Sequence, residues 1–155
     1  MWAVTARLPA AVFFYGVLRP GLVSGRMAEI VALLGSPKPA TVSGCLYAVP
    51  DPRGHYPVMV ATRAAERVNG TVLMPGPQFE ASDLAELDAF EGFDPADPIA
   101  SDYVRKRLPA TLADGAVFAA DVYRWNRPVG ADFIPIPHGD FTRYLAESGA
   151  RPLPG

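Results

Sequence analysis

The sequence is poor in the residues from which metal centres and disulfides are built. It has one cysteine, Cys45, and two histidines, His55 and His138, among 155 residues. A single cysteine cannot form an internal disulfide, and a small domain without disulfides is typical of a reducing compartment. The two histidines stand far apart, without the close spacing of zinc ligands. We therefore expect no metal, no cofactor and a cytoplasmic location.

Further absences narrow the class of protein. The sequence contains neither the G-x-S-x-G turn of hydrolases nor the G-x-x-x-x-G-K-[ST] loop of nucleotide-binding proteins. The formal net charge is only −2, which gives no reason to expect a nucleic-acid partner. The apolar segment over residues 8–18 is too short to span a bilayer and is followed by Arg19-Pro20-Gly21 rather than by a cleavage site. We expect a buried strand there and no membrane association.

What the sequence does contain is typical of one packed domain. Half of the residues are hydrophobic, and a chain of 155 residues leaves little room for a second core, so we expect a single domain over residues 1–155. The 17 prolines and 14 glycines are scattered between apolar runs, as turns between short strands would require.

Apolar patterns predict about six strands and three helices. The expected strands cover residues 12–18, 40–49, 56–62, 67–74, 103–112 and 117–126. The expected helices follow Ser24, Ser82 and Asp140 and end near Gly35, Gly92 and Gly149. This order is not a repeated β-α-β series, so we expect an α+β fold with a small mixed, mostly antiparallel β-barrel and short helices at its rim. Loops at the mouth of such a barrel are a usual place for small ligands.

Glu91 is the most informative single residue. It follows Leu84 and Leu87 by seven and four positions, which places its carboxylate on the apolar face of the expected helix. Desolvation and the negative end of the helix dipole would both raise the pKa of this carboxyl, as a general acid/base requires. The pattern alone equally allows a hydrated or arginine-paired glutamate at a frayed helix end.

Gly16 lies inside an apolar run, where glycine weakens a strand unless something must approach the backbone closely. A ligand held by free backbone N–H groups is one explanation, and a β-bulge or tight bend is the other. Farther along, Tyr103, Arg105 and Arg107 alternate on one strand face. They would either neutralise a substrate carboxylate or form a solvated basic face.

Two of these segments together resemble a known family. Tyr15-Gly16-Val17-Leu18-Arg19 followed by Gly21 is similar to the YG[ST]LxxG signature of the γ-glutamylcyclotransferase-like, or AIG2-like, superfamily. The segment over residues 87–92, Leu-Asp-Ala-Phe-Glu-Gly, resembles the LDxxEG segment of that family, and Tyr103-Val104-Arg105 resembles the strand after it. The two motifs also occur in the family's order.

The resemblance implies a fold, a reaction and a site. The fold is a small mixed barrel, and the reaction cyclises a γ-glutamyl amide to 5-oxoproline with release of an amine or amino acid. Carried over by position, Glu91 is the general acid/base. The substrate-binding residues are Tyr15, Gly16, Val17, Leu18, Tyr103 and Arg105. No cofactor is implied, and the partner is a small-molecule γ-glutamyl substrate.

The chain departs from the family pattern in two places. Val17 stands where the family usually has serine or threonine, so a hydroxyl contact is missing although a backbone N–H contact would survive. An insert over residues 93–102 precedes Tyr103 and could reshape the mouth. A non-catalytic ligand-binding or regulatory module is therefore an alternative, as is an enzyme of the same chemistry acting on another γ-glutamyl amine. A monomer and a homodimer both remain open.

Overall fold

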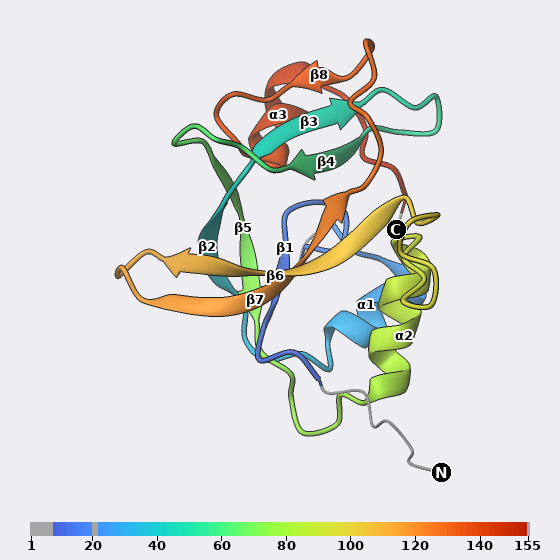
Figure 1. The fold of residues 1–155 in the computed structure, drawn as a ribbon, viewed down its shortest axis with the longest axis vertical. Helices are drawn as coiled ribbons and strands as arrows, with labels where there is room; N and C mark the ends of the chain where they lie inside the picture. The colour runs from blue at the N-terminus through green and yellow to red at the C-terminus, as the bar shows by residue number, and fades with distance from the viewer. Residues whose placement is uncertain (1–7, 20–21, 155) are drawn as a thin grey trace.

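The computed structural model describes residues 8–19 and 22–154. In this part of the chain a closed barrel contains five strands in the order β1-β5-β2-β6-β7 (Figure 1). Their bounds are β1 Val12–Phe14, β5 Arg67–Leu73, β2 Lys38–Ser43, β6 Tyr103–Leu112 and β7 Val117–Trp125. All neighbouring pairs are antiparallel except β1 and β7, which are parallel. The prediction of a mixed, mostly antiparallel barrel is confirmed.

A second, three-stranded sheet lies above one end of the barrel together with helix α3 (Figure 1). It contains β4 (Tyr56–Val60), β3 (Cys45–Val49) and β8 (Ile134–Pro135). The single strand expected over residues 40–49 is therefore wrong, because the chain leaves the barrel at Gly44 and enters this sheet. A Cβ atom at Gly44 would lie 2.9 Å from Cγ of Met59 and 3.2 Å from the carbonyl oxygen of Val60, so the crossing requires glycine.

The first strand is also shorter than predicted. It ends at Phe14, and residues 15–19 form a turn in which the Arg19 N–H donates to the Gly16 carbonyl oxygen at 3.0 Å. Pro20 and Gly21, the end of the expected turn, lie outside the described residues. The short β8 was not predicted, since two residues carry no alternating pattern.

The three helices of the described chain are α1 (Gly25–Val31), α2 (Ala81–Phe90) and α3 (Phe141–Ser148). The predicted cap of α2 at Ser82 is wrong: Glu80 is the N-cap, and it exchanges hydrogen bonds with Asp83 in a capping box. The predicted cap of α3 is confirmed, because the Asp140 side chain accepts from the Arg143 N–H at 3.2 Å. Helix α1 ends at Val31, before the expected stop at Gly35.

Two groups of buried side chains hold these parts together. One fills the barrel and continues into the small sheet through residues such as Phe13, Met59 and Phe141. The other joins α1 and α2 to the outside of the barrel, with Ile30 and Leu87 fully buried. Leu84 belongs to this second group, so the apolar stripe of α2 faces the protein as predicted.

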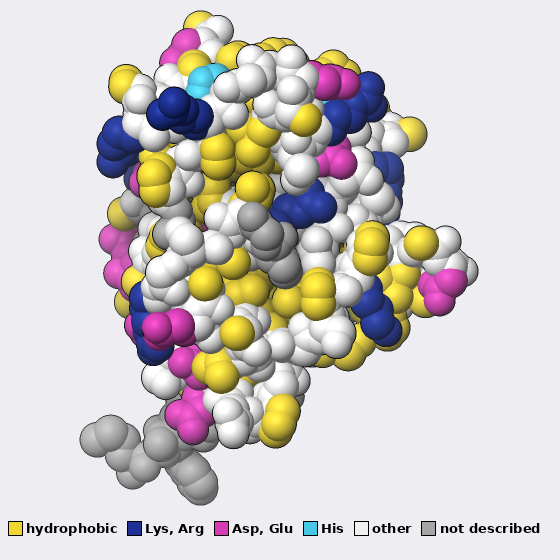
Figure 2. All heavy atoms as spheres, turned by 180° about the vertical axis from the view of Figure 1, so that it is seen from behind, with side chains coloured by type: hydrophobic (Ala, Val, Ile, Leu, Met, Phe, Trp, Pro, Cys, Tyr) yellow, Lys and Arg dark blue, Asp and Glu magenta, His cyan; other side chains and the backbone are white. Residues whose placement is uncertain are grey.

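The outer surface carries both signs of charge. Figure 2 shows basic and acidic side chains interspersed over the back of the molecule, which matches the formal net charge of −2. Among the helices of the described residues, none is long and apolar enough to cross a membrane.

Candidate active site

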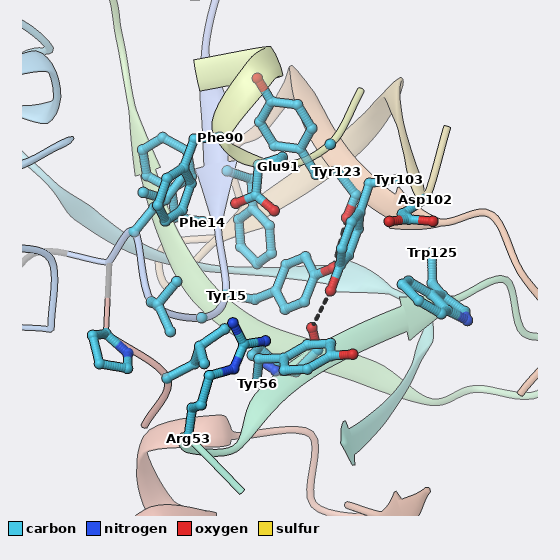
Figure 3. Close-up of a pocket in the computed structure, with 18 residues that line it drawn as sticks. Phe14, Tyr15, Arg53, Tyr56, Phe90, Glu91, Asp102, Tyr103, Tyr123 and Trp125 are labelled. Atoms are coloured by element: carbon cyan, nitrogen blue, oxygen red, sulfur yellow. Dashed lines mark hydrogen bonds between the residues drawn. The ribbon is translucent and has the colours of Figure 1, made fainter. Parts of the chain in front are cut away.

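A cavity of about 370 Å³ lies where the barrel, the small sheet and the C-terminal end of α2 meet (Figure 3). Its wall is formed by β1 and the turn after it, by the start of β4, by the end of α2, by the start of β6 and the end of β7, and by the C-terminal segment. The volume is in the range of small-molecule sites in proteins.

The structure brings most of the predicted site residues to this cavity. Lining residues include Glu91, Tyr15, Gly16, Val17, Leu18 and Tyr103. Tyr123 and Trp125, near the end of β7, line it as well. Of the insert over residues 93–102, Asp102 alone reaches the cavity. Arg105 does not line it.

Glu91 is the C-cap of α2, directly after its last residue, Phe90. Its N–H still donates to the Leu87 carbonyl oxygen at 3.0 Å, and Gly92, with φ of 72°, turns the chain away after it. The partly buried carboxylate lies among the rings of Phe14, Tyr15 and Tyr123 (Figure 3). The side chain has no hydrogen-bond or ion-pair partner among residues 8–19 and 22–154, so the arginine pairing left open by the sequence is not formed there.

Desolvation in this setting raises the pKa of Glu91 from 4.5 to about 7. The direction is the one that the apolar face of the helix predicted. A carboxyl group with a pKa near neutrality is able both to accept and to donate a proton under ordinary conditions. Glu91 therefore has the protonation behaviour of a general acid/base.

This pKa makes a stability prediction for Glu91→Gln. Between pH 4.5 and about pH 7 the unfolded chain has lost a proton that the folded protein keeps, so wild-type stability falls as the pH rises and then levels off. Glutamine removes this loss. We expect the variant to be more stable than wild type by about 1 to 3 kcal/mol above pH 7 and nearly equal below pH 4. Urea unfolding at pH 4 and pH 8 measures it, and an equal difference at both pH values would contradict it.

The turn over residues 15–18 offers hydrogen-bond donors. Within the described parts of the chain, the backbone N–H groups of Gly16, Val17 and Leu18 donate to no acceptor. The group that approaches Gly16 closely belongs to the protein itself, because a Cβ atom at this position would overlap Cγ of Pro57 on β4. Glycine is thus needed so that the turn packs against β4, and the packed turn presents its N–H groups beside the cavity.

The hydroxyl groups of the two predicted tyrosines are already engaged. The Tyr15 hydroxyl donates to the Tyr123 carbonyl oxygen at 2.6 Å. The Tyr103 hydroxyl donates to the Pro57 carbonyl oxygen at 2.9 Å, which joins the barrel to the small sheet (Figure 3). Burial raises the pKa of both phenols well above the usual value, so both stay protonated. They fix the shape of the cavity, and Glu91 remains the group suited to proton transfer.

Arg105 lies behind the cavity in a partly buried ion-pair network. Its Nε donates to Oδ1 of Asp88 at 3.0 Å and its Nη1 to Oδ2 of Asp121 at 2.6 Å. Asp88 also accepts from the Tyr123 hydroxyl at 2.6 Å. Arg105 therefore neither forms part of a solvated basic face nor lies free to neutralise a substrate carboxylate, the two alternatives that the sequence allowed. Its face of the strand is covered by α2, and its charge is balanced by two aspartates. The side chain of Arg107 is 64% exposed and contacts Asp121 from outside.

Sequence reasoning missed several residues of this region. Asp88 precedes Glu91 by three positions and Asp121 interrupts an apolar strand, but neither pattern shows that an arginine lies opposite. Arg53 and Tyr56 line the cavity from the β3–β4 loop and the start of β4. Within the described residues, no three His, Cys, Asp or Glu side chains are grouped so that they could hold a metal ion.

The chain matches the family model described as "Gamma-glutamyl cyclotransferase, AIG2-like" over residues 12–143. It therefore belongs to the AIG2-like γ-glutamyl cyclotransferase family. The matched region includes both motifs and every element that lines the cavity except the C-terminal segment. Family membership supports a cyclotransferase-type enzyme that acts on small molecules, in general terms. No curated protein matches the sequence.

Solved structures show the same fold. YkqA from Bacillus subtilis is 19% identical with a TM-score of 0.65, and the match covers 92% of this chain but only 43% of YkqA. An AIG2-like protein from Mus musculus is 17% identical with a TM-score of 0.61, over 87% of this chain and 89% of that one. A yeast γ-glutamyl cyclotransferase specific to glutathione is 14% identical with a TM-score of 0.53, over 90% and 84% of the two chains. Identities this low support the fold alone.

Proposed function

We propose that this protein cyclises a γ-glutamyl amide to 5-oxoproline and releases an amine or amino acid, with Glu91 as general acid/base. The observation that carries the proposal is a partly buried carboxylate without a protein partner, with a pKa of about 7, in a cavity also lined by turn residues whose backbone N–H groups are unpaired within the described chain. The proposal includes a small-molecule γ-glutamyl substrate, one domain, a cytoplasmic location and either a monomer or a homodimer.

The reaction needs little from the protein because its nucleophile belongs to the substrate. The α-amine nitrogen forms a bond to the γ-carbonyl carbon, and the bond from that carbon to the leaving nitrogen breaks. The ionised Glu91 accepts a proton from the attacking nitrogen and then donates it to the leaving nitrogen. Holding the substrate in the folded conformation supplies much of the remaining rate enhancement.

The turn after β1 is suited to the charge that the substrate carries or develops. Its N–H groups at Gly16, Val17 and Leu18 would bind a carboxylate or the oxyanion on the γ-carbonyl oxygen. Because these are backbone groups, the valine at position 17 does not remove them. The aromatic and apolar side chains around Glu91 exclude water and so favour cyclisation over hydrolysis.

The proposal is tested by incubating the protein with γ-glutamyl amino acids, γ-glutamyl amines and glutathione and measuring 5-oxoproline. We expect at least one class to be converted. The matched control is the glutaryl amide of the same amine, which lacks the α-amine and must remain intact if the nucleophile is intramolecular. Binding of γ-glutamyl compounds without any turnover would instead identify a ligand-binding module.

Gly16→Ala tests the role of the turn. The new methyl group would overlap the Pro57 ring and force the turn away from β4, so we expect kcat/KM to fall at least about tenfold as the N–H groups move. The control is Gly149→Ala at the end of α3, where φ is 72° and no atom lies within 4 Å of the new methyl group. That variant should lose about 1 kcal/mol of stability and keep its turnover. Unchanged kinetics in Gly16→Ala would show that the turn does not hold the substrate.

A further inference from the structure

The charges around the cavity are unevenly placed. Among the lining residues of the described chain, Arg53 is the only basic one, and its side chain is 76% exposed at the mouth. Glu91 is partly buried on the opposite side, with Tyr15 between the two (Figure 3). Asp102, the other acid on the wall, has an arginine partner of its own, since Arg127 Nε lies 3.1 Å from its Oδ1. Arg53 is thus the group at the rim best able to attract an anion.

The position of Arg53 is fixed by its neighbour Asp51. One carboxylate oxygen of Asp51 accepts from the Arg53 backbone N–H at 2.8 Å and from its Nε at 3.0 Å, and the other accepts from Nη2 at 3.2 Å. Nη1 has no partner in the part of the chain that the structure describes. The guanidinium is therefore held in one orientation with a donor nitrogen left over for a ligand.

The loop that carries Arg53 is also held from outside. The His55 N–H donates to the Arg151 carbonyl oxygen at 2.7 Å, and the Leu153 N–H donates to the His55 carbonyl oxygen at 2.8 Å. Gly54, which joins Arg53 to His55, has φ of 143°. A Cβ atom at this position would lie 2.6 Å from the Pro152 carbonyl oxygen. The C-terminal segment thus keeps the loop against the mouth, where Leu153 lines the cavity beside Arg53.

We propose that Arg53 determines specificity by binding a carboxylate on the leaving group, so that γ-glutamyl amino acids are preferred to γ-glutamyl amines. The inference rests on the proposed function, because it requires the γ-carbonyl to lie beside Glu91. With that carbonyl and the turn N–H groups occupied by the glutamyl part, the leaving group extends toward the mouth. A carboxylate on it then meets Arg53 Nη1 in a charge-assisted hydrogen bond.

The test compares γ-glutamyl-alanine with γ-glutamyl-ethylamine, which differ only in the leaving-group carboxylate. We expect wild type to favour the dipeptide by about threefold to fivefold in kcat/KM, which is the upper range for one exposed ion pair. Arg53→Gln should lose this preference through slower conversion of the dipeptide alone, and Arg53→Lys should retain part of it. The control Arg143→Gln removes another exposed arginine, which is paired with Glu147 outside the cavity, and both substrates should react as before.

Each of the following results would overturn the inference. Equal losses on both substrates in Arg53→Gln would mean that Arg53 binds the common γ-glutamyl part. Unchanged kinetics, or a wild type without preference, would mean that Arg53 does not contact the substrate. If neither substrate gives 5-oxoproline while other γ-glutamyl compounds do, Arg53 does not select this class and the proposed function stands. If no γ-glutamyl compound reacts at all, the proposed function fails and the inference fails with it.

Discussion

Replacing Glu91 with glutamine is expected to lower kcat by about a hundredfold to ten-thousandfold in a protein that stays folded. Glutamine keeps the size of the side chain at the end of α2 but can no longer take a proton from the attacking nitrogen and deliver it to the leaving nitrogen. Substrate binding should change little, because the turn N–H groups remain. The measurement is 5-oxoproline formation at saturating substrate, with a thermal melt on the same preparation.

The matched control is Glu86→Gln on the same helix. Glu86 is exposed and paired with Arg26 through Nη2 at 2.8 Å, away from the cavity, so its loss should leave turnover unchanged. The pH dependence gives a second readout: wild-type kcat/KM should rise about tenfold per pH unit below pH 7 as the carboxyl with a pKa of about 7 ionises. Full turnover in folded Glu91→Gln, or a wild-type profile without a step near pH 7, would end the assignment.

The largest loss of stability is expected from Arg105→Gln, at about 3 to 5 kcal/mol. Arg105 donates to both Asp88 and Asp121, whose side chains are each 5% exposed. Without the guanidinium, two buried carboxylates lie near each other with no opposite charge between them. Urea unfolding at neutral pH measures the loss.

Arg107→Gln is the control for this network. It also contacts Asp121, at 3.2 Å, but from the solvent side, and exposed ion pairs contribute little to stability. We expect a clearly smaller effect than for Arg105→Gln. If both variants lost equally little stability, the Tyr123 hydroxyl and local water would be enough to stabilise the two buried carboxylates. The ion-pair network would then not be a main source of stability at the end of α2.

Most strands and the buried face of α2 could be predicted, because they depend on the spacing of apolar residues close together in the sequence. The continuous and alternating apolar runs correspond to strands β2 to β7, and the first part of the run over residues 12–18 corresponds to β1. The helical spacing of Leu84 and Leu87 predicted the buried face of α2. Where the chain leaves the barrel was not predictable, since Gly44 interrupts an otherwise continuous strand and its requirement comes from Met59, a distant residue. The short β8 exists only because β3 offers it a partner.

In the candidate site, too, residues with an unusual local pattern were predicted, and residues placed by distant parts of the chain were missed. Glu91 was found because an acid on an apolar helix face is visible in the sequence, and Gly16 because glycine in a strand-like run is unusual. Strand alternation placed Arg105 on a face but gave no information on what covers that face, so its partners Asp88 and Asp121 were missed. Arg53 lies in a polar loop without periodicity, and nothing in the sequence brings that loop to the cavity.

The central claim is that an intramolecular amine opens the γ-glutamyl bond in this cavity. It is tested most directly by following one γ-glutamyl substrate and measuring 5-oxoproline, the released amine and glutamate in the same reaction. The proposal predicts one 5-oxoproline for each amine released, with no glutamate above the uncatalysed rate. Release of amine together with glutamate would show hydrolysis by water, and the absence of all three products across the γ-glutamyl panel would show that the cavity binds without catalysing.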